Sequence, residues 1–234
     1  MRRLPLPEDV DPTELDPEVR RDLRSLTKEA ADRVAGHLVV AGKLVDEDPA
    51  TALEHARAAR ALGGRIGAVR EAVGIVAYLA GDYAEALAEL RTARRLTGSS
   101  EHLPLMADSE RGLGRPERAL RMLEDPQVGD LDRAARVELL IVASGARRDM
   151  GQFDAAVAML EIPELRATRR KPVEAMELID AWIPRLWYAY ADALVAADRS
   201  EEAVDWYEAV TTVDDGETDA AERLEALEGS DSSG

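Results

Sequence analysis

A seven-residue segment recurs along this chain at intervals of 33 to 47 residues. The clearest copy, Gly81 to Leu87, reads Gly-Asp-Tyr-Ala-Glu-Ala-Leu, and its first residue has counterparts at Glu47, Gly114, Gly151 and Asp198. Recurrence with this period indicates one supersecondary unit that is used several times. Such units stack, because each one buries its apolar surface against its neighbours.

The stretch from Gly67 to Ser100 shows what the unit is. Between Val69 and Ala80 the apolar residues fall three or four positions apart, which predicts one face of a helix. Gly81 favours the end of that helix, and Asp82 can accept hydrogen bonds from the first N–H groups of a second one. A second apolar stripe follows and ends at Gly98. The spacing therefore predicts an antiparallel helical hairpin, in which the small residues Gly74 and Ala86 would let the two backbones approach closely.

This pattern resembles the tetratricopeptide repeat family. The matching positions in the central repeat are Val73, Gly74, Gly81, Tyr83, Ala86 and Ala93. Those in the last repeat are Trp187, Tyr190, Ala191, Ala203 and Tyr207. Arg70 stands where the family has a large aromatic residue, and the last turn lacks its glycine. The resemblance covers residues 33 to 215 and implies an all-α fold, a right-handed α-solenoid of stacked antiparallel helical hairpins.

The register of the repeats divides the chain into an arm, a solenoid and a tail. Residues 1–16 are acidic and rich in proline, which predicts a flexible arm. The solenoid is expected over residues 17–215. Its repeats are expected at 33–66, 67–99, 100–136, 137–183 with an insertion, and 184–217. A short C-terminal helix is expected at 218–228, and a disordered tail at 229–234.

Composition excludes several classes of protein. The chain has no cysteine, which excludes disulfides, zinc–thiolate sites and thiol chemistry. It has no run of about eighteen apolar residues that would span a membrane, and its acidic start lacks the apolar core of a signal peptide. The near replacement of lysine by arginine fits a GC-rich bacterial genome. We therefore expect a cytoplasmic protein without membrane association.

The charge of the chain is strongly negative and uneven. The net charge of −17 disfavours nucleic-acid binding, because a phosphate backbone is repelled at long range. Residues 211–234 alone carry Arg223 against eight acidic residues, a net charge of −7. A tail of this charge could occupy arginines on a binding face, so that deleting residues 216–234 would raise the affinity for a partner.

The sequence has no motif for catalysis or for a cofactor. The three histidines, His37, His55 and His102, have no carboxylate pair at metal-ligand spacing, so no metal site is predicted. A phosphate loop, a nucleophile elbow and a dinucleotide fingerprint are all missing. We expect no enzymatic activity and no cofactor.

The family resemblance implies where a partner would bind. In the family, the first helix of each hairpin lines a concave face, and four positions of each repeat point into it. The positions carried over include His37, Glu71, Tyr78, Asp108, Arg111, Glu138, Arg148, Tyr188 and Asp192. Their mixed charge does not match the family's basic carboxylate clamp. It favours a polar peptide or helix from a partner protein.

Two further features allow either a structural or a functional interpretation. The densest basic run lies in the insertion and consists of Arg166, Arg169, Arg170 and Lys171. It is either a hydrated linker or a contact for an acidic or phosphorylated partner. Tyr188 and Trp206 fall outside the predicted buried stripes, so they are either packing residues or an exposed aromatic anchor.

The leading hypothesis is a non-catalytic scaffold that binds a protein or peptide segment on the concave face, as a monomer or a weak homo-oligomer. One alternative is a helical-repeat protein associated with RNA or ribonucleoprotein, which would use the arginines near residues 111 to 121, 147 to 148 and 166 to 171. The other is a self-assembling structural protein that associates through an uncapped end of the solenoid.

Overall fold

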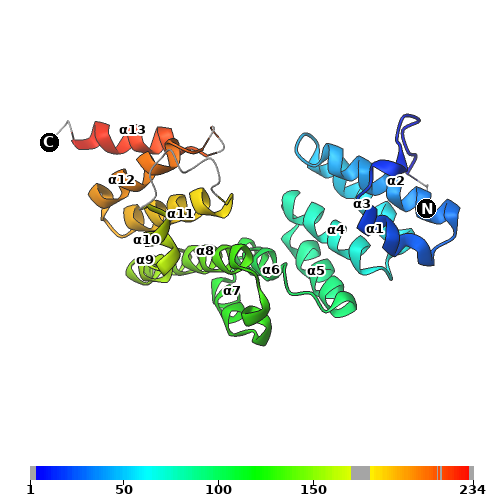
Figure 1. Ribbon diagram of the computed structural model, residues 1–234, viewed down its shortest axis with the longest axis horizontal. Helices are drawn as coiled ribbons and strands as arrows, with labels where there is room; N and C mark the ends of the chain where they lie inside the picture. The colour runs from blue at the N-terminus through cyan, green and yellow to red at the C-terminus, as the bar shows by residue number, and fades with distance from the viewer. Residues whose placement is uncertain (1–3, 170–179, 215, 217, 232–234) are drawn as a thin grey trace. The chain divides into compact units, whose positions relative to one another are not determined.

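The protein folds into helices throughout the residues that its computed structural model describes, which are 4–169, 180–214, 216 and 218–231 (Figure 1). It divides into two compact units, Met1–Arg115 and Pro116–Gly234, and each is described by itself. The predicted all-α fold is confirmed. Across the described ranges, no helix combines the length and the apolarity that crossing a membrane requires.

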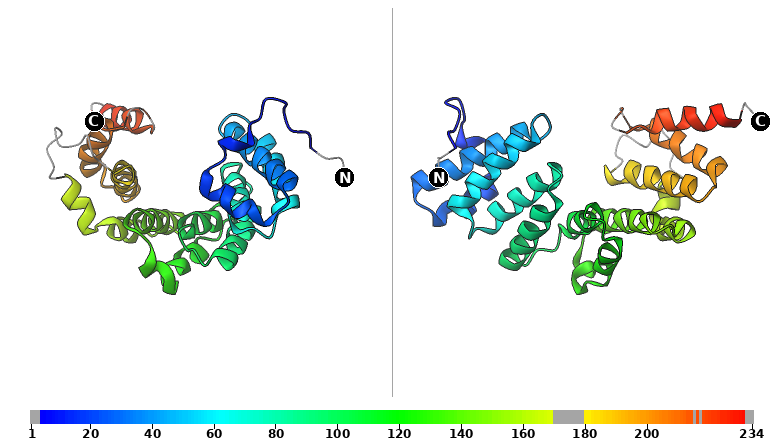
Figure 2. Two further views of the ribbon diagram at one scale, coloured as in Figure 1. Left: turned by 45° about the vertical axis from the view of Figure 1, so that its right-hand side comes forward. Right: turned by 180° about the vertical axis from the view of Figure 1, so that it is seen from behind.

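The first unit is a series of stacked hairpins. Its elements are η1 (Pro12–Glu14), α1 (Pro17–Asp22), η2 (Leu23–Ser25), α2 (Lys28–Leu44), α3 (Pro49–Gly63), α4 (Gly67–Leu79), α5 (Tyr83–Thr97) and α6 (Leu103–Gly112). Each of the helices from α2 to α6 packs against the next one along the chain, and α2 with α3 and α4 with α5 form the closest pairs (Figures 1 and 2). This is the predicted hairpin arrangement.

Local sequence signals explain where these helices begin and end. The Asp82 carboxylate accepts a hydrogen bond from the Glu85 backbone N–H at 3.1 Å and so caps the start of α5. Gly81, in the turn before it, has a φ of 76°, a left-handed conformation that glycine adopts without a steric cost. The turn between α4 and α5 therefore lies where the sequence predicts it.

Gly74 lets α4 and α5 approach closely, as expected. A Cβ atom added at Gly74 would lie 2.7 Å from the Leu90 Cγ atom and 3.2 Å from the Leu90 backbone nitrogen. The second distance matters more, because a backbone atom cannot move aside as a flexible side chain can. The small residue thus sets the distance between the two helices of this hairpin.

The N-terminal arm is more ordered than its composition indicates. From residue 4 onward it lies along α2, where the Leu6 side chain and Val10 would meet a Cβ at Gly36 at 2.9 Å and 3.6 Å. The Lys43 Nζ atom lies 2.5 Å from the Glu14 carboxylate. Because Gly36 has no side chain, Leu6 and Val10 of the arm can pack directly against the backbone of α2. Composition alone does not reveal this contact.

The second unit contains α7 (Pro116–Arg121), η3 (Met122–Glu124), η4 (Pro126–Asp130), α8 (Arg133–Asp149), α9 (Phe153–Leu160), α10 (Pro163–Arg169), α11 (Trp182–Ala196), α12 (Ser200–Thr211) and α13 (Ala220–Asp231). The boundary between the units falls after Arg115, so the helices of the expected repeat 100–136 belong to different units. Its second helix, α7, has only 6 residues. Helix α13 continues to Asp231 and so includes the first residues of the expected tail at 229–234.

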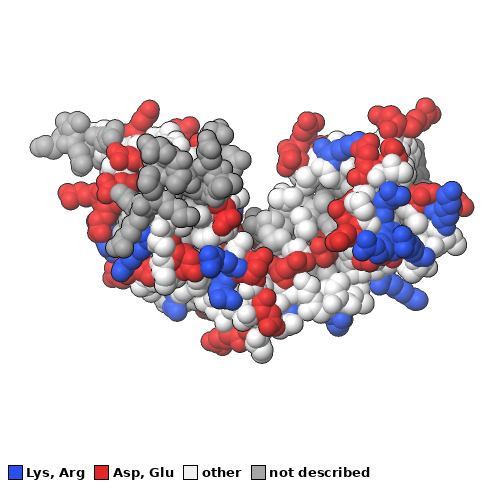
Figure 3. All heavy atoms as spheres, viewed as in Figure 1, with Lys and Arg blue, Asp and Glu red and all other residues white. Residues whose placement is uncertain are grey.

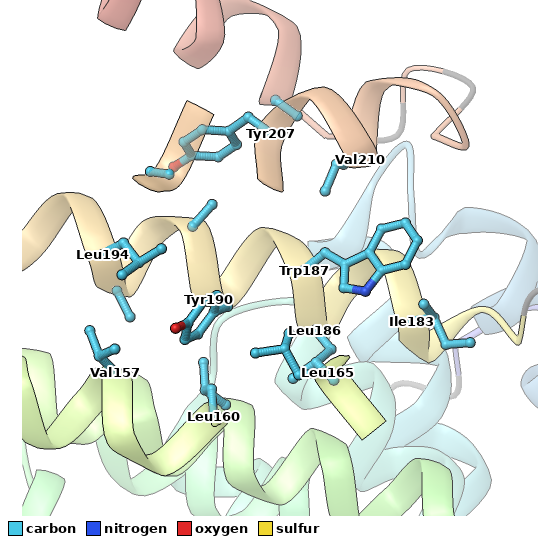
Figure 4. Close-up of a cluster of buried hydrophobic side chains, with 14 of the residues drawn as sticks. Val157, Leu160, Leu165, Ile183, Leu186, Trp187, Tyr190, Leu194, Tyr207 and Val210 are labelled. Atoms are coloured by element: carbon cyan, nitrogen blue, oxygen red, sulfur yellow. The ribbon is translucent and has the colours of Figure 1, made fainter. Parts of the chain in front are cut away.

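The core of the second unit is built around α11. Leu186, Trp187 and Tyr190 of this helix pack against Leu160 of α9 and Leu165 of α10 (Figure 4). The Trp187 indole Nε1–H donates to the Thr168 Oγ1 atom at 2.9 Å. Tyr207 and Val210 of α12 cover the other side, and Ala220, Leu224 and Leu227 of α13 complete the cluster. Most of the aromatic residues near the C-terminus are therefore packing residues.

Candidate functional site

The candidate site in the first unit lies on the facing sides of α4 and α6. The Tyr78 hydroxyl donates to the Asp108 Oδ2 atom at 2.6 Å, and the Arg111 Nη1 atom donates to Asp108 Oδ1 at 2.7 Å. The side chains of Asp108 and Arg111 are each 25% exposed, so this charged pair remains open to solvent. The structure thus brings together three of the expected site residues from two consecutive repeats.

Glu71 of α4 belongs to a second group, with Glu101 and His102 just before the start of α6. Its Oε1 atom lies 3.2 Å from His102 Nε2, and Glu101 Oε1 lies 3.5 Å from the same nitrogen. Burial alone would lower the pKa of His102, but the hydrogen bond to Glu71 and the negative charges of Glu71 and Glu101 outweigh it and raise the pKa.

These three residues could also hold a metal ion, because their donor atoms all lie within 4.8 Å of one another. A protonated imidazole balanced by two carboxylates accounts for the same geometry without an ion. The spacing of the sequence could not reveal this group, since Glu71 reaches the other two residues only through the packing of α4 beside α6.

His37 is not available to a partner, which corrects the expectation for this residue. Its side chain is buried, with 1% of the residue exposed, and its Nδ1 atom lies 3.0 Å from the Nδ1 atom of His55. Burial first, and then the charges of His55 and Arg33, lower the pKa of His37 to about 4. His37 lies inside the continuous buried run from Val34 to Ala41, so α2 is covered on more than one face.

In the second unit, the expected residues on α8 and α11 form ion pairs across the two helices. Arg185 donates to Glu138 through two parallel hydrogen bonds, from Nε at 2.6 Å and from Nη2 at 2.9 Å. The Arg148 Nη1 atom lies 2.9 Å from the Asp192 Oδ2 atom. Two planar N–H donors facing two carboxylate oxygens give the first pair a fixed geometry.

Asp192 is shared by three side chains. Besides Arg148, it accepts from the Tyr207 hydroxyl at 2.7 Å and from Arg223 Nη1 at 2.8 Å, both on its Oδ1 atom. Burial and the hydrogen bond to Asp192 raise the pKa of Tyr207, so this phenol stays protonated and remains a donor. A carboxylate with three donors is well satisfied despite its partial burial.

Helix α13 contacts the same surface. The Arg223 guanidinium lies 5.6 Å from the centre of the Tyr188 ring, and the Tyr188 hydroxyl donates to the Asp219 carboxylate. The expectation was that acidic tail residues would occupy arginines of the binding face. In this structure the roles are reversed. Arg223 of the tail forms an ion pair with Asp192 of the face, because Arg223 is the charged residue of α13 that contacts α11.

Of the basic run in the insertion, only the side chain of Arg166 is described. Arg166 is exposed on α10, the side chain of Arg169 is not described, and Arg170 and Lys171 lie outside the described residues. Trp206 is partly buried and packs edge-on against the Tyr190 ring, with the ring centres 5.1 Å apart. Trp206 therefore has a packing role rather than that of an exposed anchor.

A charged network between neighbouring hairpins was not anticipated. Arg60 Nη1 of α3 donates to Glu85 at 2.6 Å and to Glu89 at 2.5 Å, both on α5, and Arg70 Nη1 of the first helix α4 donates to Glu89 at 2.7 Å. Glu89 is 5% exposed, and two arginines compensate its buried charge. These ion pairs link neighbouring hairpins, so the role of the network is structural.

Charges of both signs are mixed over the face of the protein in Figure 3. The name "first-helix surface" covers two groups, each within its own unit: Tyr78–Asp108–Arg111 in the first unit, and Glu138–Arg185 with Arg148–Asp192 in the second. Each group joins first helices of successive hairpins through hydrogen bonds and ion pairs.

Comparisons with known proteins give distant likenesses among solved structures. No protein-family model and no curated protein matches the chain. Among solved structures, YrrB, described as a TPR protein with an unusual peptide-binding site, is similar at 15% sequence identity and a TM-score of 0.46. The match covers 80% of this chain and 89% of YrrB. Such a distant match transfers no residue and no partner, and it is the stacked hairpins themselves that make the fold tetratricopeptide-like.

Proposed function

We propose that the protein is a non-catalytic scaffold that binds a polar segment of a partner protein through its first-helix surface. The observation that carries this proposal is the half-exposed pairing of acids and arginines between successive first helices. Arg111 and Asp108 are each 25% exposed, and Arg148 is 31% exposed. Beyond its bond to Asp192, the Arg148 guanidinium has further N–H donors that can reach a partner's carboxylates or carbonyl groups.

The alternation of charge favours a protein over other classes of partner. A nucleic acid would need an uninterrupted row of cations, whereas the arginines are paired with Asp108 in the first unit and with Glu138 and Asp192 in the second. A segment that itself alternates acids and bases would match the surface and gain specificity from the match. We therefore propose a peptide or helix of mixed charge.

Reversing two charges of this surface tests the proposal. The variant combines Arg111→Glu with Arg148→Glu. When the wild-type protein and the variant are each used for affinity capture from a native cell extract, the variant should recover much less of the partner than the wild type. The reason is that each new glutamate lies beside an existing aspartate and repels an acidic group on the partner. Captured proteins are identified by mass spectrometry, with and without nuclease treatment.

A matched control changes the net charge equally but leaves the first-helix surface intact. Arg95→Glu on α5 and Arg118→Glu on α7 serve this purpose, because both arginines are exposed residues of second helices. Capture should be unchanged in the control, and circular dichroism should show both variants folded. Equal recovery by both variants would remove this surface from the proposal, and loss only after nuclease treatment would replace it with nucleic-acid binding.

Helix α13 should compete with the partner for Asp192. Arg223→Gln frees one of the two arginine contacts of Asp192 but keeps Ala220, Leu224 and Leu227 in the core. Deleting residues 216–234 would uncover that core and is therefore the poorer test. Since an exposed ion pair contributes about 0.2–1 kcal/mol, the affinity for the captured partner should rise by up to about fivefold.

The measurement is the Kd of the captured partner by biolayer interferometry. Arg199→Gln is the control, because it removes the same charge from an arginine paired locally with Glu202. Affinity that is unchanged in Arg223→Gln would show that α13 does not overlap the binding surface.

A further inference from the structure

A pocket of about 510 Å³ opens in the first unit, and none of its lining residues belongs to the first-helix surface. It lies between the N-terminal arm at Pro12 and Thr13, the α1–η2 segment, and the first two turns of α2. The arm forms one wall, held there by a hydrogen bond from Arg20 Nη1 to the Thr13 carbonyl at 3.3 Å and by the Glu14–Lys43 ion pair. Its volume is that of an ordinary ligand pocket.

Cations line this pocket although the protein as a whole is strongly acidic. Arg20, Arg21, Arg24 and Lys28 contribute to the lining, against the single acid Asp32. Within the described residues, Arg21, Arg24 and Lys28 have neither a hydrogen bond nor an ion pair. The arginines of the first-helix surface differ in this respect, because all of them are paired with carboxylates.

The base of the pocket is apolar. Leu23 is 2% exposed, and Leu26, Ala31 and Ala35 surround it. The site therefore combines an apolar base with several cations that have no partner in the chain. A ligand that satisfies both parts carries an apolar side chain flanked by negative charges.

We propose that this pocket binds a short acidic peptide segment in which carboxylates flank a leucine-sized side chain. A guanidinium group can donate two parallel hydrogen bonds to one carboxylate. Such pairs would give the pocket affinity for an acidic peptide and fix the orientation of that peptide. The lining holds no aromatic residue on which a nucleotide base could stack. It also holds too many cations for a metal ion. The site is independent of the first-helix surface, and its test requires no partner that is still to be identified.

The proposal is tested by fluorescence anisotropy on the full-length protein with three labelled probes. The first is an acetylated, amidated Glu-Leu-Glu-Leu-Glu peptide. The second replaces each leucine by glycine, and the third replaces each glutamate by lysine. The first peptide should bind, the glycine peptide should bind at least about tenfold more weakly because it leaves the apolar base empty, and the lysine peptide should not bind.

Two variants locate the binding. Arg21→Gln with Arg24→Gln should weaken the first peptide by at least about tenfold, because both guanidinium groups are lost. Neither arginine has a partner in the described chain, so the double variant should fold normally. The matched control, Arg65→Gln with Arg95→Gln, removes two exposed arginines elsewhere in the first unit and should bind as the wild type does.

A photo-crosslinking derivative of the first peptide gives an independent readout, with the expected crosslinks in residues 12–35. Binding that is unaffected by the Arg21 and Arg24 substitutions would overturn the proposal, as would crosslinks elsewhere. Equal binding of the glycine peptide, or displacement of the first peptide by inorganic phosphate at the same concentration, would show a simple anion site and overturn the assignment to a peptide.

Discussion

Replacing Trp187 by alanine should lower the free energy of unfolding of the second unit by about 3–5 kcal/mol. Trp187 is 2% exposed and lies at the centre of the cluster that joins α9, α10, α11 and α12 (Figure 4). The substitution removes a fully buried tryptophan side chain and leaves a cavity that rigid neighbouring helices fill only in part. It also removes the hydrogen bond to Thr168, which ties α10 to α11.

The measurement is urea unfolding followed by circular dichroism and by the fluorescence of the two tryptophans that remain, Trp182 and Trp206. Both belong to the second unit, so fluorescence reports on that unit alone. Phe153→Ala is the control, because this side chain is 42% exposed and its loss should change stability by no more than about 0.5 kcal/mol. Similar effects of the two substitutions would contradict the assignment of Trp187 to the centre of the core.

Acidification from pH 7 to pH 4 should remove about 3 kcal/mol of stability from the first unit through His37. Burial lowers the pKa of His37 from an ordinary value of 6.5 to about 4, and burial also lowers the pKa of His55. The unfolded chain therefore takes up a proton before the folded chain does as the pH falls. The contribution is complete above about pH 6.5 and is lost progressively down to about pH 4.

The double variant His37→Leu, His55→Leu should flatten this dependence, because removing both partners leaves no buried polar atom unsatisfied. His102 contributes with the opposite sign, because its raised pKa favours the folded state at low pH. The unfolding free energy of the variant should therefore fall less on acidification than that of the wild type. The unfolding free energy is measured by circular dichroism between pH 4 and pH 8.

Tryptophan fluorescence serves as the internal control for this second experiment, because all three tryptophans belong to the second unit. The substitutions should leave the fluorescence transition unchanged at every pH. A variant that keeps the pH dependence of the wild type in circular dichroism would show that the pair of histidines is not its source.

The sequence predicts the hairpins well because local chemistry decides them. Asp82 caps α5 through an atom three residues away, and Gly81 adopts its left-handed conformation whatever surrounds it. The close approach at Gly74 is likewise predictable, because the period of the apolar stripes already places it opposite the second helix. Interactions of this kind join residues that are close in the sequence, or residues of the two helices of one hairpin.

The repeat register predicts which candidate residues lie close together, but it does not predict how deeply each one is buried. The repeat register correctly brings Tyr78 near Asp108 and Arg148 near Asp192, since equivalent positions of successive hairpins lie side by side. It places His37 on the same surface, and this is wrong, because the register describes one face of a helix and does not show how many neighbours cover it. The first hairpin is covered further by the arm and by its own second helix.

The sequence by itself determined the all-α class, the hairpin unit, and the start and end of most helices, all of which depend on interactions within a few turns of chain. The tertiary structure alone decided that His37 meets His55, that Arg223 binds Asp192, and that Arg21, Arg24 and Lys28 remain without carboxylate partners around one pocket. Burial and the pairing of charges depend on the sum of all neighbours in space. For these residues the neighbours come from segments that a repeat pattern does not place, such as the arm and α13.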